Sequence, residues 1–424
     1  MSKKVLIIAY YWPPAGGPGV QRWLKFVKYL PDFGIEPIVY IPENPNYPIL
    51  DKTLIDEVPS GIAVLKKPIK EPYKFAYFLS KNSKTISKGL IPIKKKQSLF
   101  QKFMLYIRGN YFIPDARVGW VKPSLGYLSD YIEQNSIQTI ITTGPPHSLH
   151  LIGLKLKQKL NLNWIADFRD PWTSIDYHKE LKLTKSSQNK HKELEKQVLN
   201  TADQIIVTSE TTKREFQQLT SKSIEVISNG YDVMKATNIP LDKKFSISHI
   251  GSLLSERNPE VLWKVLGQLV SDNLDFSNNL EINLVGVVSD SVMNSLRKFN
   301  LIDYVNRVGY VSHNESIKYQ KKSQLLLLLE SNITQKQGII PGKFFEYMVS
   351  NRPILAIGPR PWDVSEILKE TNSGTAFGYL DEEALKSKII EYFKAFKSGN
   401  LESYAIGLQK YSRKALTEHL AKLL

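Results

Sequence analysis

The sequence predicts an α/β protein built from two units, each with a parallel β-sheet that helices cover on both faces. Short, wholly apolar runs alternate with amphipathic segments along most of the 424 residues. Runs that are apolar at every position are typical of strands buried on both faces of a parallel sheet. The runs fall into two series with a polar stretch at 233–244 between them. The length agrees, because roughly 150 residues per domain gives two domains or slightly more.

Each series contains recognisable strands. In the first we expect strands at 5–11, 37–41, 138–142, 164–167, 204–208 and 225–227. In the second we expect them at 246–250, 281–285, 304–308, 324–329 and 353–356. Apolar residues at helical spacing lie between the strands, for example at 20–30 and 261–269. No apolar stretch reaches the roughly 20 residues that a membrane-spanning helix needs.

The domain boundaries follow from these series. We expect an N-terminal domain at 1–235 and a C-terminal domain at 236–404. The helical pattern from 381 onward is long enough to cross back, so 405–424 is expected to pack on the N-terminal domain.

Composition excludes several classes of site. The chain has no cysteine, which excludes disulfide frameworks, Cys-ligated zinc, iron–sulfur clusters and a cysteine nucleophile. This fits a reducing cytoplasm. Lys3 and Lys4 precede an apolar run, as in a signal peptide, but the run ends at Trp12-Pro13-Pro14 without a small-residue cleavage site. We therefore interpret it as a first strand.

Positive charge is concentrated in one segment. The chain carries a net charge of +16. Residues 66–122 hold 14 Lys or Arg against two acidic residues, a balance of 14 − 2 = +12, and aromatic residues are interleaved with them. Two interpretations stay open: a solvated surface insertion, or contact with an anionic apolar surface such as lipid headgroups or a lipid diphosphate. Nucleic acid is less favoured.

The first candidate site is the glycine-rich segment at 13–20, between the first strand and the first helix. Glycines let a backbone approach a ligand closely, and a helix N-terminus offers free N–H groups to a phosphate. The segment is not a dinucleotide fingerprint, since Arg22 stands where a third glycine belongs, and no Gly-Lys-Ser/Thr follows as in a Walker loop. A tight strand-to-helix turn is the alternative.

Two further segments follow strands of the first series. Thr143–Ser148 contains His147 in a position that favours ligand contact, although a lone histidine is usually structural. Ala166–Trp172 contains two aspartates and Arg169. An Asp–Arg pair that holds the loop is one interpretation and contact with an acceptor substrate is the other. A metal site is disfavoured, because no neighbouring His or Glu completes a ligand set.

The second series supplies a cation and a carboxylate. Gly251–Pro259 follows the first strand of this series, and Arg257 in it can meet a phosphate bidentately or be a solvated loop arginine. Gln337–Tyr347 is a Gly/Pro loop that opens a helix bearing Glu346. That carboxylate suits ribose hydroxyls, or is simply an acid favoured by the helix dipole.

Taken together, these segments resemble the family-4 retaining glycosyltransferases, which have the GT-B architecture. The resemblance covers nearly the whole chain, and it is carried by the order and spacing of 16–21, 145–147, 228–232, 251–259 and 341–347. It implies two Rossmann-like domains that face each other across a cleft.

The resemblance also implies roles for single residues. The backbone at 16–19 would meet the donor diphosphate and the acceptor, and His147 would contact the transferred sugar. Arg257 would grip the diphosphate, and Glu346 would hold the ribose. The expected catalytic residues are His147, Gly17 and Arg257. The expected donor-binding residues are Gly16, Gly19, Ser252, Arg257, Gly309, Tyr310, Val311, Gly342, Lys343, Phe344 and Glu346. The expected acceptor-binding residues are Arg169, Asp170, Arg108 and Arg117.

The chain departs from the family pattern at two positions. Gly338 stands where the family has the first acid of its Glu-x7-Glu motif. In the family that acid contacts the hydroxyls of the donor sugar, so the resemblance does not imply which sugar is used. At the position after Gly251, where the family usually has an arginine, this chain has Ser252. One diphosphate cation is therefore missing, and our hypothesis is that Arg257 or Lys343 carries its load.

These observations predict a glycosyltransferase that moves a sugar from a nucleotide-diphosphate sugar to a glycan or a polyprenyl-diphosphate-linked acceptor. Retention and independence from metal ions are implied by the resemblance, and no cofactor is expected beyond the nucleotide sugar. The expected location is cytoplasmic, with 66–122 resting on the inner face of the membrane and no nucleic-acid partner. A nucleotide-sugar epimerase or hydrolase of the same fold is the alternative, as is a basic membrane- or nucleic-acid-binding protein.

Overall fold

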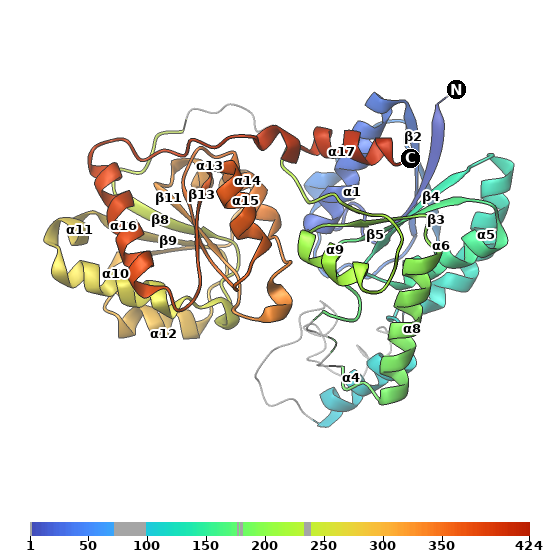
Figure 1. Ribbon diagram of the computed structural model, residues 1–424, viewed down its shortest axis with the longest axis horizontal. Helices are drawn as coiled ribbons and strands as arrows, with labels where there is room; N and C mark the ends of the chain where they lie inside the picture. The colour runs from blue at the N-terminus through green and yellow to red at the C-terminus, as the bar shows by residue number, and fades with distance from the viewer. Residues whose placement is uncertain (1, 72–98, 176–177, 179–180, 233–238) are drawn as a thin grey trace. The chain divides into compact units, whose positions relative to one another are not determined.

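The computed structural model describes residues 2–71, 99–175, 178, 181–232 and 239–424, which form two compact units (Figure 1). Unit 1 comprises 1–229 and 413–424, and unit 2 comprises 230–412. Both units are parallel α/β structures, so the predicted fold class is confirmed. Among the described residues no helix is long and apolar enough to cross a bilayer.

Unit 1 is organised around a parallel sheet of seven strands in the order β3-β2-β1-β4-β5-β6-β7. The strands are β1 (Lys3–Ile8), β2 (Ile35–Pro42), β3 (Ala63–Lys67), β4 (Thr139–Gly144), β5 (Asn163–Phe168), β6 (Gln204–Val207) and β7 (Ile224–Val226). The helices are α1 (Pro18–Tyr29), α4 (Leu99–Tyr111), α5 (Val121–Gln134), α6 (Ser148–Lys159), α8 (Lys185–Thr201), α9 (Glu210–Gln217) and α17 (Arg413–Lys422).

Unit 2 has a parallel sheet of six strands in the order β10-β9-β8-β11-β12-β13. The strands are β8 (Phe245–Ile250), β9 (Leu280–Val285), β10 (Val305–Gly309), β11 (Leu325–Leu329), β12 (Ile354–Ile357) and β13 (Gly374–Phe377). The helices are α10 (Glu260–Asp272), α11 (Leu274–Asn279), α12 (Asp290–Lys298), α13 (His313–Lys322), α14 (Gly342–Met348), α15 (Asp363–Thr371) and α16 (Glu382–Lys397). A short 3-10 helix, η4 (Ser255–Arg257), follows β8.

Both sheets have the strand order of a Rossmann-like unit, in which the direction of winding reverses beside the first strand. The reversal falls between β1 and β4 in unit 1 and between β8 and β11 in unit 2. Ligands of open α/β sheets bind in the crevice beyond the carboxyl ends of the strands at such a point. The loops that follow these four strands are therefore where a site is expected.

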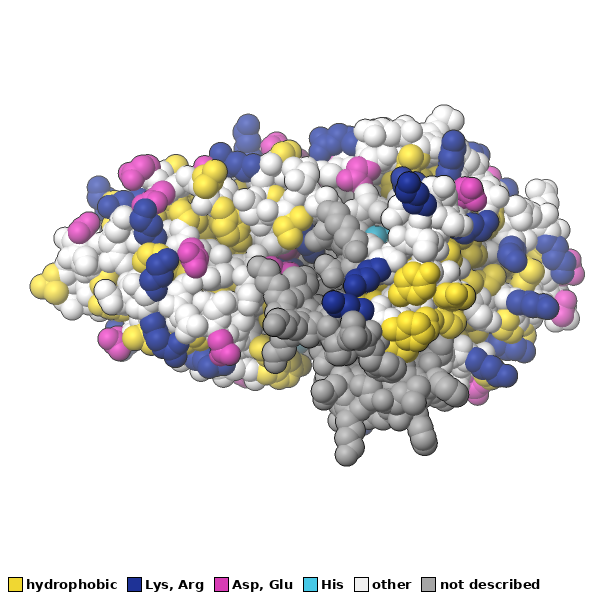
Figure 2. All heavy atoms as spheres, turned by 90° about the horizontal axis from the view of Figure 1, so that it is seen from below, with side chains coloured by type: hydrophobic (Ala, Val, Ile, Leu, Met, Phe, Trp, Pro, Cys, Tyr) yellow, Lys and Arg dark blue, Asp and Glu magenta, His cyan; other side chains and the backbone are white. Residues whose placement is uncertain are grey.

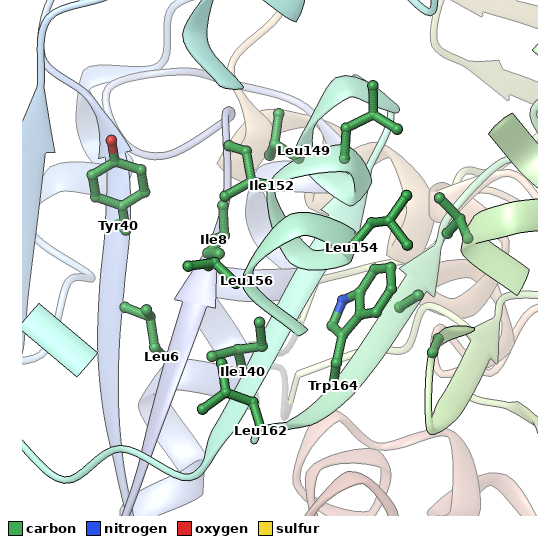
Figure 3. Packing of buried hydrophobic residues seen from close by; sticks show 14 of the residues in the cluster. Leu6, Ile8, Tyr40, Ile140, Leu149, Ile152, Leu154, Leu156, Leu162 and Trp164 are labelled. Carbon is green, nitrogen blue, oxygen red and sulfur yellow. The ribbon is translucent and has the colours of Figure 1, made fainter. Parts of the chain in front are cut away.

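The strands are apolar throughout because both faces of each sheet are covered. Along β1, Leu6 and Ile8 pack into one core while Val5 and Ile7 pack into the other. Figure 3 shows the first of these cores, in which Leu6 and Ile8 lie near Ile140 of β4 and side chains of α6. The five leucines of β11 alternate in the same way between the two cores of unit 2.

The C-terminal helix α17 belongs to unit 1 and lies beside α1 (Figure 1). The sequence placed all of 405–424 on this unit and the first boundary after 235, but 405–412 belong to unit 2 and unit 1 ends at 229. Leu416 and Leu420 are buried in the core that also contains Trp23 and Val27 of α1. The Arg413 guanidinium donates to the side chain of Gln21 at 2.8 Å.

Three details differ from the expected elements. The short strands β3 and β13 were missed because they are only partly buried and lack a distinct apolar run. Strand β1 ends at Ile8, and the apolar residues after it begin the loop toward α1. The helical pattern from 381 onward is interrupted between α16 and α17, where Gly399 and Gly407 have positive φ values.

Candidate functional site

The glycine loop of unit 1 connects β1 to α1 at the carboxyl edge of the sheet. Gly17 precedes the helix with φ 107°, which favours glycine, and Pro18 is the first helical residue. The amide of Gly16 donates to the carbonyl of Ile49 at 3.0 Å, so the loop is tied to the β2–β3 connection. A methyl group on Gly19 would overlap the guanidinium of Arg169. The Arg169 guanidinium thus packs on the backbone at Gly19, whereas a Cβ on Gly17 would meet no atom within 4 Å.

Arg169 links this loop to the end of β4. Its Nε donates to the carbonyl of Gly144 at 3.3 Å, its Nη2 donates to the carbonyl of Pro145, and its backbone carbonyl accepts from Thr208. The predicted acceptor-binding residues Arg169 and Asp170 thus lie at the edge where the Gly16–Gly19 loop and the Pro145–His147 segment meet. Both side chains are partly exposed.

Beneath this edge lies a buried ion pair. Asp167 at the end of β5 pairs with Arg22 of α1 at 2.9 Å, and both side chains are at most 2% exposed. The same carboxylate accepts from Trp23 and Thr143, each at 2.8 Å. Arg22 also donates to the carbonyl of Ser228 at 2.9 Å. Asp167 of the 166–172 segment is thus in an Asp–Arg pair, but its partner is Arg22 of α1 and not Arg169 of the same segment.

His147 lies at the end of the β4 loop as the N-cap residue of α6. Its ring is 2% exposed and stacks on Trp172, with centroids 4.9 Å apart. Neither ring nitrogen has a hydrogen-bond partner among the described residues. Burial, together with nearby histidines and Arg169, holds the pKa of His147 well below its usual value. The ring is therefore neutral, with two buried nitrogens that have no partner among the described residues; the sugar contact stays a prediction.

Three more histidines are buried around Trp172. His150 bonds to Thr142 at 2.8 Å, and His191 accepts from Trp172 Nε1 at 3.1 Å. The rings of His178 and His191 are 4.7 Å apart. Burial lowers the pKa of His150 to about 3 and that of His178 to about 4. The described histidines and carboxylates form no group arranged to hold a metal ion.

The basic segment is anchored through its two acids. Glu71 accepts from Tyr10 at 2.8 Å and pairs with Arg117 at 3.1 Å, and Asp115 accepts from Ser148. Arg117 is therefore part of an internal ion pair, and its side chain is 10% exposed. Arg108 lies in the last turn of α4. Residues 72–98 of the predicted surface insertion lie outside the described residues.

In unit 2 the loop after β8 begins at Gly251, which has φ 119°. Its amide donates to the carbonyl of Val285 at 2.7 Å. Ser252 is exposed at the edge of the sheet. Lys343, from the first turn of α14, reaches this loop: its Nζ donates to the carbonyl of Ile250 at 2.8 Å and lies 3.3 Å from His249 Nε2.

Arg257 in η4 lies at the same edge, held by Glu330, which follows β11 directly. Two nitrogens of the guanidinium meet the two carboxylate oxygens at 3.1 and 3.2 Å. Glu330 is fully buried, whereas the Arg257 side chain is 31% exposed. The pair thus fixes an arginine at the point where the winding of the sheet reverses. The structure brings Arg257, Lys343 and Gly251 together.

Glu346 lies one turn further along α14. Its Oε1 is 3.0 Å from His313 Nε2, and its Oε2 accepts from Gln320 at 2.9 Å. The predicted base-binding segment follows β10: Gly309 has φ 80°, Tyr310 is 89% exposed and Val311 packs on the core. Of the remaining predicted donor residues, Gly342 begins α14 and Phe344 is fully buried, so only its backbone is near the edge.

Sequence reasoning missed His249, Glu330 and Trp172. Nothing local distinguishes His249 from a core residue of an apolar strand, and Trp172 was noted only as part of a segment. Glu330 did carry a signal, because an acid directly after five leucines stands at the carboxyl end of a buried strand.

Comparison with known proteins defines the class. Residues 97–235 match the model described as Glycosyltransferase Family 4. No curated protein matches the chain in sequence. Sucrose-phosphate synthase from Thermosynechococcus elongatus is similar in structure, with a TM-score of 0.62, 13% identity, and coverage of 99% of this chain and 98% of that one.

Two further structures are similar over almost their whole lengths. A variant of S. aureus TarM, in complex with fondaparinux, alpha-GlcNAc-glycerol and UDP, has a TM-score of 0.58 and 14% identity, and 99% of each chain is covered. A Listeria monocytogenes protein titled a UDP-N-acetylglucosamine 2-epimerase has a TM-score of 0.56 and 11% identity, with coverage of 99% of this chain and 95% of that one.

Residues 97–235 thus match a glycosyltransferase family model, and the whole chain shares its fold with these proteins. The predicted resemblance to family 4 is thereby confirmed over residues 97–235, and the expected two-unit architecture agrees with the fold of these structures.

Proposed function

We propose that the chain transfers a sugar from a nucleotide-diphosphate sugar to a glycan or a polyprenyl-diphosphate-linked acceptor, with retention and without a metal ion. The observation that carries the proposal is the pair of basic side chains at the carboxyl edge of unit 2. Arg257 and Lys343 lie beside the bare backbone of Gly251, and a buried carboxylate fixes the arginine.

Lys343 would replace the diphosphate-binding cation that the family pattern has after the glycine and that this chain lacks. The usual arginine after the glycine is Ser252, which has no charge. A Cβ on Gly251 would lie 3.4 Å from Lys343 Nζ, so the amine occupies the space next to that position. Two fixed cations would stabilise the negative charge that develops on the leaving diphosphate, which is the role that a divalent ion plays in other enzymes.

The remaining contacts with the donor would be made by other residues at the carboxyl edge of the unit 2 sheet. Glu346 would accept hydrogen bonds from the ribose hydroxyls, with His313 and Gln320 keeping its carboxylate in place. Tyr310, which is almost fully exposed, would lie against the nucleobase. Gly338 leaves the position of the first motif acid without a side chain, so the sugar hydroxyls would be recognised by other groups.

Unit 1 would supply the acceptor side. The neutral His147, with both ring nitrogens unbonded among the described residues, is suited to sugar hydroxyls, and Arg169 and Asp170 lie at the same edge. The open backbone at Gly17, where a Cβ would meet no atom within 4 Å, would let an acceptor approach closely.

The first experiment measures donor binding. UDP, GDP, ADP and dTDP are tested by the thermal shift that each produces, since a ligand present at 100 times its dissociation constant stabilises the folded state by about 2.7 kcal/mol. We expect one of them to bind. Lys343→Ala should weaken its binding by about 10- to 100-fold, because a hydrogen bond to a charged group contributes roughly 1.5–3 kcal/mol.

Lys298→Ala is the matched control, since this lysine belongs to the same unit and its side chain is 63% exposed. Its affinity should equal that of the unaltered protein. An unchanged affinity in Lys343→Ala would remove Lys343 from the donor site. Turnover of the donor sugar without any acceptor would instead favour the epimerase or hydrolase alternative.

We further propose that unit 1 contacts an anionic membrane surface. Helix α4 packs through Leu105 and Gly109, while Phe103 and Tyr106 are 58% and 38% exposed. Lys102 is exposed beside them. Figure 2 looks onto the side of unit 1 on which α4 lies and shows hydrophobic side chains next to Lys and Arg side chains. Aromatic and basic side chains on one helix face suit a bilayer interface.

Vesicle sedimentation tests this contact. We expect the protein to bind vesicles that contain phosphatidylglycerol, to bind phosphatidylcholine vesicles weakly, and to be released by high salt. The variant Phe103→Ser with Tyr106→Ser should bind several-fold more weakly, whereas Leu254→Ser, at an exposed leucine of unit 2, should bind normally. Equal binding to both kinds of vesicle would contradict the electrostatic part of the proposal.

A further inference from the structure

The amine of Lys343 is buried without a counter-charge of its own. Its two hydrogen-bond partners are neutral acceptors, the carbonyl of Ile250 at 2.8 Å and His249 Nε2 at 3.3 Å. Within the described part of the chain, no carboxylate lies within ion-pair distance of Nζ. Glu330, an acid that interacts with the amine electrostatically, has both oxygens engaged by Arg257.

The tautomer of His249 follows from its second contact. Its Nδ1 lies 3.1 Å from the carbonyl of Leu327, which can only accept, so Nδ1 carries the hydrogen. In a neutral ring Nε2 is then an acceptor, and it faces Lys343. Burial and the neighbouring Lys343 hold the pKa of His249 well below its usual value, while the carbonyls of Leu327 and Ser252 oppose that shift. The imidazole therefore adds no positive charge.

The charged and titratable groups around the amine are few. Arg257 faces it from η4 and disfavours a second positive charge, and Glu330 faces it from the end of β11 and favours one. Tyr347, on the same helix as Lys343, is neutral because burial raises its pKa. Burial is the largest influence and Arg257 the next, and together they lower the pKa of Lys343 to about 7. Near neutral pH the amine is thus charged in only part of the molecules.

We propose that binding of a nucleoside diphosphate in unit 2 is coupled to the uptake of one proton, which Lys343 takes from solvent. This inference rests on the proposed donor site. The bare backbone of Gly251 lets the diphosphate approach the amine, and His249 and Ile250 keep the amine there in the empty site. The negative charges of the diphosphate then favour the ammonium form, and His249 acts as a positioning residue.

The coupling predicts a pH dependence of affinity. An amine that must be protonated for tight binding, and that titrates near 7 in the empty site, weakens binding about eightfold between pH 7.5 and 8.5. The weakening continues at higher pH until the amine of the complex also loses its proton. An ordinary lysine would give no change over this range.

Isothermal titration calorimetry tests the proposal directly. UDP, GDP, ADP and dTDP, whose terminal phosphates are fully ionised at pH 8, are titrated into the unaltered protein in two buffers of different ionisation enthalpy. We expect an uptake of about 0.9 proton for the nucleotide that binds, because an amine with a pKa near 7 is about nine-tenths neutral at pH 8. Binding without proton uptake would overturn this inference and leave the donor site in place. Binding of none of the four would overturn the proposed function, and the inference with it.

Lys343→Arg assigns the proton to the side chain. An arginine stays charged at every pH used, so the variant should bind the same nucleotide with an uptake near zero and little change in affinity between pH 7.5 and 8.5. Lys298→Arg, at an exposed lysine of the same unit, should keep the full uptake. Uptake that persists in Lys343→Arg would place the proton elsewhere and contradict the assignment.

Discussion

Replacing Asp167 by alanine is expected to destabilise unit 1 by about 3–5 kcal/mol, because it leaves the buried Arg22 without a counter-charge. The same change removes the acceptor for Trp23 and for Thr143, and it releases α1 from the carboxyl end of β5. Urea denaturation followed by tryptophan fluorescence measures the loss.

An exposed pair in the same unit provides the control. Asp32 and Lys414 are 2.8 Å apart with side chains 45% and 62% exposed, so Asp32→Ala should cost less than about 1 kcal/mol. The double variant Arg22→Met with Asp167→Leu should recover much of the stability, since an apolar replacement of a whole buried pair is often neutral. A loss for Asp167→Ala no greater than that for Asp32→Ala would show that the buried pair contributes nothing.

Acid is expected to destabilise unit 1 well before its carboxylates titrate. In the unfolded chain the histidines have a pKa of about 6.5, whereas burial lowers the pKa of His150 to about 3 and that of His178 to about 4. The unfolded state therefore binds more protons below pH 6.5, and stability is lost as pH falls through that value. Each of these two histidines should cost about 2 kcal/mol between pH 8 and pH 5. His147 and His191 shift in the same direction.

Unfolding free energies measured from pH 8 to pH 5 test this expectation. Stability should be constant above about pH 7.5 and then fall steadily. His150→Gln, in which the titrating ring is lost, should show a smaller fall, whereas His419→Gln, at a histidine whose side chain is 42% exposed, should follow the unaltered protein. A flat profile down to pH 5 would mean that the buried rings are solvated in the folded state.

The fold was predictable from sequence because strands covered on both faces are apolar at every position. The residues Leu325–Leu329 could be recognised as a strand without any knowledge of their neighbours. Strands β3 and β13 at the sheet edges could not, since partial burial leaves a weaker pattern. The return of the C-terminal helix was predictable from its length, but the break before α17 was not.

The candidate site was predictable where a loop follows a strand of either series. Gly17, His147, Gly251 and Arg257 all lie at the expected edges. Their partners were not predictable, because Glu330 and His249 reach them from strands distant in sequence. Arg117 shows the reverse case: its basic character suggested a ligand, yet Glu71 engages it within the protein.

The return of α17 to unit 1 has a consequence for how the chain is made and divided. Lys3 donates to the carbonyl of Leu424, so β1 and the residues just after α17 are neighbours, and unit 2 interrupts unit 1. During synthesis, the apolar surface of unit 1 on which Leu416 and Leu420 pack stays uncovered until the ribosome has made all of unit 2. Unit 2 can be expressed as one continuous piece, whereas unit 1 would need 413–424 joined ahead of Lys3 in a circular permutant.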